Sequence, residues 1–437
     1  MIRLLFLVLL TTSVGSARAG ASASPVGDCS TGENARSVVG VYPTDPLVLN
    51  CEIARLRIRR NASEVGVSQW DLLVELAFAV QSGRSADVIR LGERWLAGEV
   101  APASANAAQV TFAVARAYWR LGRLETARAL LKPLRDEATE DYAPVDAMSY
   151  AIVAHLSPTV ATGEAKPMPA RRNDAGFIAV DGRIGEREAS FEIDTGAEIS
   201  AISASLAAAL GVVPVADVPA FTVLKGASDA GGYDEVSARL ATASKLELGG
   251  VTVENVAFAV LDDAELISPE YVVLGTPVLR TLGGVTWRDR GREILLGEPM
   301  QAAGCARARG DLYWADDLLK AAVDVRGERV PILLDTGAAN SEAYASGLAH
   351  YAPKLKKEYS LRTPRIGRIR RVAVGFGGER VIIRNMTVWR GGPSLGGPYN
   401  AFLLGEEIVR KFDYFALDLR SMTYVADKRV AAACRRP

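Results

Sequence analysis

The sequence predicts a multidomain α + β protein in which a helical-hairpin domain precedes an all-β region made of two similar lobes. Helical periodicity extends over residues 67–158, whereas short alternating or apolar runs bounded by glycine and aspartate dominate after residue 174. The same two sequence features, an Asp-Thr-Gly-Ala motif and a later Leu-Gly pair, also recur in both halves of the β region. At 437 residues, 49% of them hydrophobic, the chain is long enough to form two or three domains with buried cores.

The helical domain, residues 67–158, contains two stretches that resemble each other, Trp70–Leu96 and Ala107–Leu134. The second includes YWRLGRLETA, Tyr118–Ala127, in which a glycine allows a tight turn and a small alanine allows the next helix to pack closely. This stretch resembles the Leu-Gly-x-x-x-x-Ala core of a tetratricopeptide repeat. The resemblance implies two or three helical hairpins, and a generic helical bundle without repeat geometry is the alternative.

The β region follows residues 159–174, whose prolines, small residues and mixed charges are typical of a linker. The predicted lobes cover residues 175–300 and 312–430, with a connector at 301–311. An Asp-Thr-Gly-Ala motif recurs after 335 − 194 = 141 residues. Each motif is followed by a Leu-Gly pair, whose glycine lies 275 − 194 = 81 and 405 − 335 = 70 residues beyond the aspartate. Ordered landmarks at similar spacing indicate an internal duplication.

Each motif places an aspartate directly after a short apolar run. The two segments are FEIDTGAEISAI, Phe191–Ile202, and ILLDTGAANSEA, Ile332–Ala343. Each half resembles a lobe of the retropepsin-like aspartic peptidases, and two lobes in one chain are similar to the bilobal arrangement of pepsin. The resemblance covers roughly residues 174–427, over half of the chain. It implies that Asp194 and Asp335 form a catalytic dyad within one chain.

The expected chemistry follows from placing two carboxyl groups together. At a separation of about 3 Å they cannot both ionise, so they share one proton. The ionised aspartate activates a water that attacks the peptide carbonyl, and the protonated one donates to the carbonyl oxygen and later to the leaving amine. This scheme needs no metal and no cofactor. The resemblance further implies that Thr195 and Thr336 brace the two loops, while Gly196 and Gly337 permit close backbone approach.

Two further features refine this expectation. Ala197 and Ala338 follow the motifs where pepsins have serine or threonine. The missing hydroxyl predicts higher dyad pKa values and activity in mildly acidic to neutral conditions. Gly232 and Tyr233 are candidates for a flap that covers substrate, although an ordinary solvent-exposed turn explains them equally well.

The Leu-Gly segments of the two lobes differ. Gly275 and Gly405 are expected to pack behind the aspartate loops in both lobes. In the second lobe, however, Glu406 and Glu407 follow the glycine, where the family usually has small or polar residues. This departure leaves open whether the second lobe keeps a fully active geometry.

The N-terminus predicts export. Residues 1–19 combine Arg3, an apolar stretch and an Ala17-Arg18-Ala19 cleavage site, as in a secretory signal peptide. An uncleaved membrane anchor is the alternative, which the short apolar stretch disfavours. The alanine- and arginine-rich composition further suggests a bacterial source and therefore the periplasm.

Four cysteines are compatible with two disulfides in an exported chain. Of the three possible pairings, Cys29 with Cys51 and Cys305 with Cys434 is preferred, because each pair would tie together one region. The first pair falls in the N-terminal segment, residues 20–66. Four unpaired buried thiols are the alternative.

The net charge and the histidine content argue against several classes of function. The 51 basic and 51 acidic residues cancel, which leaves no basic surplus for nucleic acid. His155 and His350 are the only histidines, and neither lies in a recognisable context for a Ser-His-Asp or zinc mechanism.

We therefore expect an exported aspartic-type endopeptidase, a monomeric hydrolase with polypeptide substrates and no membrane span after signal removal. Its helical domain could bind a protein partner. The alternative is a non-catalytic peptide-binding or scaffold protein that uses the helical repeats and a β cleft. A further alternative pairs each lobe with a second chain.

Overall fold

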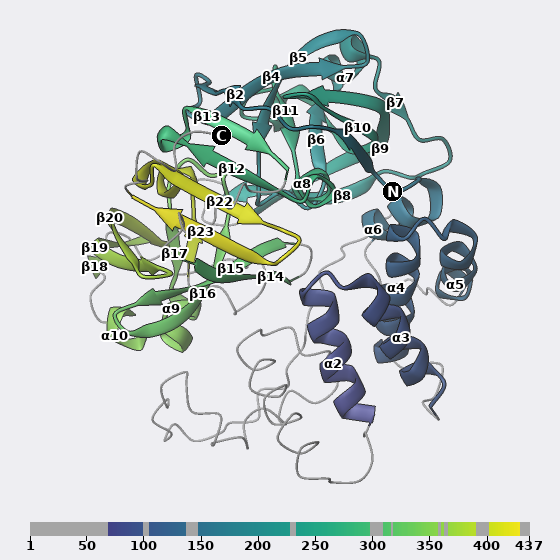
Figure 1. Ribbon diagram of the computed structural model, residues 1–437, viewed down its shortest axis with the longest axis horizontal. Coiled ribbons are helices and arrows are strands. Elements are labelled where there is room, and N and C mark those ends of the chain that lie inside the picture. Colours follow the sequence, from purple (N-terminus) through teal and green to yellow (C-terminus); the bar gives the residue numbers. More distant parts are fainter. Residues whose placement is uncertain are drawn as a thin grey trace. The chain divides into compact units, whose positions relative to one another are not determined.

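The computed structural model describes residues 69–98, 105–136, 147–227, 233–297, 309–315, 318–356, 360–361, 366–389 and 402–428 (Figure 1). It divides into a helical unit that includes Arg84–Ala154 and a β unit that includes His155–Pro437. The predicted fold class, helical hairpins followed by a bilobal all-β region, is confirmed. The predicted signal peptide, the segment 20–66 and the four cysteines lie outside the described residues.

The helical unit contains α2 (Gln69–Gln81), α3 (Ser85–Leu96), α4 (Ala105–Arg120), α5 (Leu124–Asp136) and α6 (Ala147–His155). The turn between α4 and α5 falls where the repeat-like motif predicts it, since Gly122 adopts a φ of +74°. The Arg123 amide donates to the Tyr118 carbonyl at 2.9 Å, and Ala127 is fully buried. None of the helices among the described residues is long and apolar enough to cross a membrane.

The first lobe alternates long hairpins with short helices. Its elements are β4 (Ile178–Ile184), β5 (Arg187–Ile193), β6 (Ser200–Ser203), α7 (Ala204–Leu210), β7 (Val213–Pro214), β8 (Phe221–Ala227), β9 (Tyr233–Leu248), β10 (Val251–Leu261), η2 (Asp263–Glu265), β11 (Val272–Leu274), α8 (Thr276–Leu282), β12 (Gly284–Arg288), η3 (Asp289–Gly291) and β13 (Glu293–Leu296).

The second lobe repeats this order. Its elements are β14 (Arg309–Ala315), β15 (Leu318–Val325), β16 (Glu328–Leu334), β17 (Glu342–Tyr344), α9 (Ala345–Tyr351), α10 (Pro353–Lys356), β18 (Ser360–Leu361), β19 (Ile366–Phe376), β20 (Glu379–Trp389), β21 (Phe402–Leu404), η5 (Glu406–Lys411), β22 (Tyr414–Asp418) and β23 (Thr423–Asp427).

Strand pairing reproduces the duplication predicted from the motifs. In each lobe the strand before the aspartate runs parallel to the strand that ends in Leu-Gly, β5 beside β11 and β16 beside β21. Asn255 in β10 and Asn385 in β20 both adopt positive φ, at 58° and 57°. Asparagine tolerates this left-handed conformation better than most residues. The two long hairpins therefore share a backbone irregularity as well as a topology.

The last hairpins of the two lobes join in one sheet. Strand β12 of the first lobe pairs antiparallel with β22 of the second, and β13 and β23 flank them (Figure 1). Trp287 of β12 packs against Phe415 of β22, with ring centroids 6.0 Å apart. Both side chains are almost fully buried, so apolar packing and backbone pairing hold the lobes together here.

The segment that resembles a linker contributes edge strands to the β unit. Residues 159–174 include β1 (Val160–Gly163), β2 (Met168–Pro169) and β3 (Arg171–Arg172). Strand β1 lies at one end of the first sheet and pairs with β10, while β2 lies at the end of the second sheet and pairs with β13. Proline lacks a backbone donor and is tolerated at such edges, so linker-like composition and strand pairing coexist.

Candidate functional site

Each aspartate of the motifs lies directly after a central strand. Asp194 follows β5 and Asp335 follows β16. The Asp194 amide donates to the Leu274 carbonyl at 3.0 Å, and the Asp335 amide donates to the Leu404 carbonyl at 3.1 Å. The strand that ends in Leu-Gly thus fixes the start of the aspartate loop in the same way in each lobe.

The fold brings the two aspartates together at the junction of the lobes. Their carboxyl groups are joined by a hydrogen bond, and each also accepts bonds from backbone amides of the loops. A Cβ atom at Gly196 would overlap the Asp335 carboxyl group, and one at Gly337 would overlap that of Asp194. The glycine of each motif is therefore required by the carboxylate of the opposite lobe.

Thr195 and Thr336 brace the loops across the lobe junction. The Thr195 amide donates to Thr336 Oγ1 and the Thr336 amide donates to Thr195 Oγ1, both at 3.1 Å. Each hydroxyl also donates to the opposite strand: Thr195 Oγ1 to the Leu334 carbonyl at 2.8 Å, and Thr336 Oγ1 to the Ile193 carbonyl at 2.5 Å. Both threonines are buried, so this four-bond bridge lies beneath the carboxyl groups.

The pKa values of both carboxyl groups are raised. Burial, followed by the neighbouring charge and hydrogen bond of Asp194, raises the pKa of Asp335 well above its ordinary value. Burial also raises the pKa of Asp194, but hydrogen bonds from Gly196 and other donors oppose this rise. Burial and mutual proximity therefore favour a state in which the pair holds one proton.

A serine six residues after each aspartate completes the support of the site. Ser200 Oγ accepts from the Gly275 amide and Ser341 Oγ accepts from the Gly405 amide, both at 3.1 Å. Both serines are buried. Sequence analysis missed them, although aligning the two motifs as Asp-Thr-Gly-Ala-x-x-Ser would have revealed the pair.

Gly275 and Gly405 lie behind the loops, as the sequence predicts. A Cβ atom at Gly275 would come within 2.8 Å of the Ala197 carbonyl oxygen, and one at Gly405 within 2.5 Å of the Ala338 carbonyl oxygen. The next amide in each lobe donates to that same oxygen, from Thr276 at 2.9 Å and from Glu406 at 2.7 Å. A larger residue would break these contacts.

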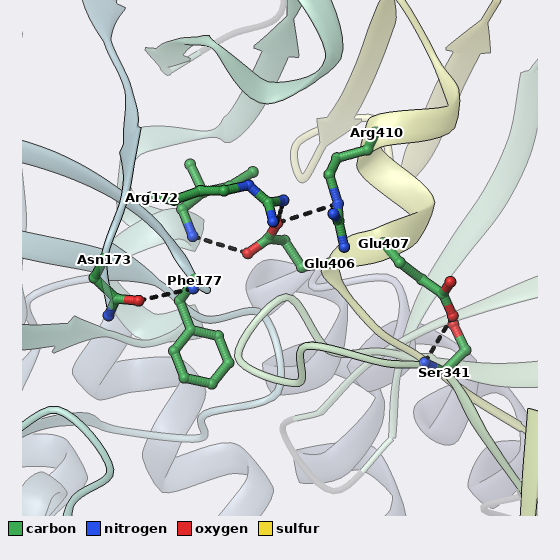
Figure 2. A network of polar contacts seen from close by, with 8 residues as sticks. Arg172, Asn173, Phe177, Ser341, Glu406, Glu407 and Arg410 are labelled. Atoms are coloured by element: carbon green, nitrogen blue, oxygen red, sulfur yellow. Dashed lines mark hydrogen bonds and ion pairs between the residues drawn. The ribbon is translucent and has the colours of Figure 1, made fainter. Parts of the chain in front are cut away.

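Glu406 and Glu407, where the sequence departs from the family pattern, both take part in this support (Figure 2). Glu407 Oε1 accepts from the Ser341 amide at 2.9 Å and so helps to fix the second aspartate loop. Glu406 is 1% exposed and accepts from Arg172 Nη2 at 2.7 Å and from the Ile178 amide at 2.8 Å. Glu406 and Glu407 therefore connect the second aspartate loop to the first lobe.

A third carboxyl group, Glu192, lies two residues before Asp194. It is buried and accepts a hydrogen bond from Asn173 Nδ2, which also contacts Ser268 Oγ at 3.1 Å. Burial raises the pKa of Glu192 to about 7, and the charges of Asp194 and Glu270 act in the same direction. An acidic residue within a strand gave no signal of this in the sequence.

The corresponding position in the second lobe, Leu333, belongs to an apolar cluster. Its buried members are Leu318, Leu333, Tyr344 and Leu403, with Ala338 and Trp389 packed against them. The surroundings of the two aspartates thus differ, with an acidic and amide network beside one and an apolar cluster beside the other.

Of the two predicted flap residues, the structure describes one. Tyr233 is the first residue of β9, paired with Ala227 of β8, whereas Gly232 lies outside the described residues. In the part of the chain that the structure describes, no group of three or more His, Cys, Asp or Glu residues is arranged to hold a metal ion.

Residues 180–278 match the family described as aspartyl protease. A search of curated protein sequences finds no match. Among solved structures, basic 7S globulin from soybean aligns with a TM-score of 0.38 and 12% identity, over 64% of this chain and 97% of the globulin chain. Conglutin gamma, a basic 7S globulin from lupine seeds, aligns with a TM-score of 0.39 and 10% identity, over 63% and 97% of the two chains. The resemblance predicted from the first motif is confirmed by the family match.

Proposed function

We propose that this protein, whose first β lobe matches the aspartyl protease family, is an exported aspartic endopeptidase with Asp194 and Asp335 as its catalytic dyad. The observation that carries this proposal is the pair of hydrogen-bonded carboxyl groups, braced from below by Thr195 and Thr336. Two facing carboxylates repel each other, and a protein that only binds peptides has no physical need for them.

We assign the shared proton to Asp335, because burial and, in addition, the charge and hydrogen bond of Asp194 raise its pKa, and this assignment gives each aspartate a role. Asp194, the ionised member, accepts a proton from a water held between the carboxyl groups, and this water attacks the peptide carbonyl. Asp335, the protonated member, donates a hydrogen bond to the carbonyl oxygen as it gains negative charge. Proton transfer to the amine nitrogen then releases the product. The threonine bridge keeps both groups in place without reorganisation.

The raised pKa values also support activity in mildly acidic to neutral conditions. The reaction needs exactly one proton on the dyad, and activity is lost when Asp335 gives up this proton. Because the pKa of Asp335 is raised well above the ordinary range, the loss falls at higher pH than for an ordinary carboxyl pair. A rate profile confined to strongly acidic solution would contradict this.

The remaining parts of the proposal rest on the sequence. Residues 1–19 support export, and the composition supports the bacterial periplasm as the compartment. Because both motifs belong to one chain, the dyad needs no second subunit, and we expect an active monomer. Size-exclusion mass measured at the assay concentration would reveal a dimer if activity required one.

Cleavage of casein, an unstructured protein, tests the function. The full chain should cleave casein and be inhibited by pepstatin, whereas Asp194→Asn and Asp335→Asn should each lose at least about 10³-fold in rate. Asp311→Asn is the matched control, because Asp311 is an exposed carboxylate paired with Arg329 at 2.9 Å. If wild type and both dyad variants leave casein equally intact from acidic to neutral pH, the protein is a peptide-binding or scaffold protein instead.

A further inference from the structure

A cavity of about 750 Å³ lies away from the dyad, at the junction of the two lobes. We call it the arginine pocket, because Arg171, Arg172, Arg290, Arg292 and Arg410 all line it. The arginines come from three places: β3, the η3 turn between β12 and β13, and the η5 segment that follows Gly405. Neither the dyad nor the threonine bridge contributes to this cavity.

The arginine pocket carries a positive balance. Its acidic lining residues are Asp289 and Asp413, and Glu406 contacts two of its arginines. Asp181 likewise contacts the pocket's Arg171, at 2.7 Å. Five guanidinium groups against four carboxylates leave 5 − 4 = +1. The whole chain, in contrast, has a formal net charge of zero, so this concentration of positive charge is local.

Two of the arginines converge on Glu406 from opposite lobes (Figure 2). Arg172 Nη2 lies 2.7 Å and Arg410 Nε 3.5 Å from Glu406 Oε1. Arg410 Nε is itself buried and makes no hydrogen bond. This nitrogen is therefore held only by its ion pair with Glu406, and an oxygen-rich anion would bind to the more exposed guanidinium groups of the pocket.

The other side of the pocket is formed by a strained turn. Asp289, Arg290 and Gly291 adopt consecutive positive φ angles of 45°, 59° and 83°. Two of these residues are not glycine, so the conformation is unfavourable and must be maintained by its surroundings. It holds Arg290 and Arg292 at the pocket, with side chains that are 67% and 80% exposed. Each contacts a single carboxylate, at 3.1 Å from Asp413 and 3.5 Å from Asp289 respectively, and a guanidinium has five N–H donors.

We propose that the arginine pocket binds a small multivalent oxyanion, such as an oligophosphate or a polycarboxylate. A guanidinium group binds two such oxygens at once, and the local excess of positive charge together with five guanidinium groups favours an anion with several oxygens. The volume exceeds the needs of a single phosphate and falls in the usual range for small-molecule sites. Its apolar lining consists of Ala170 and Ile178, and no aromatic residue is among its lining residues.

Calorimetric titration of the full chain with tripolyphosphate, and separately with citrate, at low ionic strength tests the site. We expect saturable binding of at least one of these anions. The double variant Arg290→Gln/Arg292→Gln should weaken it by at least about tenfold for each guanidinium lost. Because both side chains are exposed, this variant should keep the wild-type melting temperature, which is measured alongside.

Arg329→Gln is the matched control, since Arg329 is an exposed arginine paired with Asp311 outside the pocket. It should bind the anion as wild type does. The proposal is overturned if neither anion binds saturably to wild type, if the double variant binds as tightly as wild type, or if Arg329→Gln loses as much affinity as the double variant. None of these results depends on peptidase activity.

Discussion

Glu192 is a carboxyl group whose surroundings suit its protonated form. It is 8% exposed, and burial raises its pKa from an ordinary value of 4.5 to about 7. The folded protein therefore holds a proton on Glu192 at pH values where the unfolded chain releases it. This contribution to stability is fully present below pH 4.5 and is lost as the pH rises to about 7.

The Glu192→Gln variant should remove this pH dependence. Between pH 4.5 and 7 the free energy of unfolding of wild type should fall by up to about 3 kcal/mol more than that of the variant, from a pKa shift of about 2.5 units. Urea unfolding of the β unit at a series of pH values measures this difference. Glu293→Gln, which changes a side chain that is 40% exposed, is the control. Parallel wild-type and Glu192→Gln curves would contradict the assignment.

Sequence reasoning at this scale identified the aspartates but not their surroundings. Asp194 and Asp335 were predictable because a short motif recurs after an apolar run, and the chemistry of paired carboxyl groups is general. Glu192 lies in the motif segment Phe191–Ile202, but its partner Asn173 lies 19 residues away, in a stretch that carries no motif. Which glutamate becomes buried depends on tertiary packing, and a single sequence does not record that.

The aspartate loop and the Leu-Gly strand behave as one element in each lobe. Three contacts recur in both lobes: the aspartate amide to the leucine carbonyl, the glycine amide to a serine hydroxyl, and the following amide to the alanine carbonyl. In the second lobe, the Ser341 hydroxyl accepts from the buried Gly405 amide at 3.1 Å and so joins the aspartate loop to the Leu-Gly strand. Its loss should affect both stability and the position of Asp335.

The Ser341→Ala variant should destabilise the β unit by about 1–3 kcal/mol, since it leaves a buried amide without its acceptor. It should also lower kcat on casein, because the loop that holds Asp335 becomes less rigid. Ser421→Ala is the control: Ser421 is exposed, and its change should stay within about 0.5 kcal/mol. Chemical unfolding and steady-state kinetics check the two effects. A Ser341→Ala variant as stable and active as Ser421→Ala would show that the glycine amide does not depend on this hydroxyl.

The sequence predicts the strands well where a motif repeats in both lobes, and less well where a short strand lies at the edge of a sheet. The two lobes and their Leu-Gly strands follow from the duplicated landmarks. The residues of β1, β2 and β3 have the composition of a linker, because strands of two to four residues are too short to show an alternating pattern. Their existence depends on partners up to 294 − 168 = 126 residues away, such as Ile294, which pairs with Met168, and local composition gives no sign of these partners.

Across the whole β unit, the two lobes are joined by three different kinds of contact. The β12–β22 pairing and the Trp287–Phe415 packing form an extended connection, and the threonine bridge forms a local one beneath the dyad. Glu406 supplies the third, a buried carboxylate of the second lobe bound to Arg172 and to the Ile178 amide of the first. Burial raises its pKa, and the charges of Arg172 and Arg410 oppose that rise.

The Glu406→Ala variant should destabilise the β unit by about 1–3 kcal/mol, because it leaves the buried Ile178 amide without its acceptor. The arginines left behind are 44% and 38% exposed, so water can solvate their charges. Glu406→Gln should cost less, because an amide oxygen can still accept from the Ile178 amide at 2.8 Å. The reference is Glu293→Ala, which breaks a half-exposed pair with Arg288 at 3.1 Å and should cost no more than about 1 kcal/mol. Because the Glu406 amide also donates to the Ala338 carbonyl beside the dyad, kcat should fall together with stability. If the three variants unfold at the same denaturant concentration, the buried carboxylate does not hold the lobes together, and the paired hairpins alone must do so.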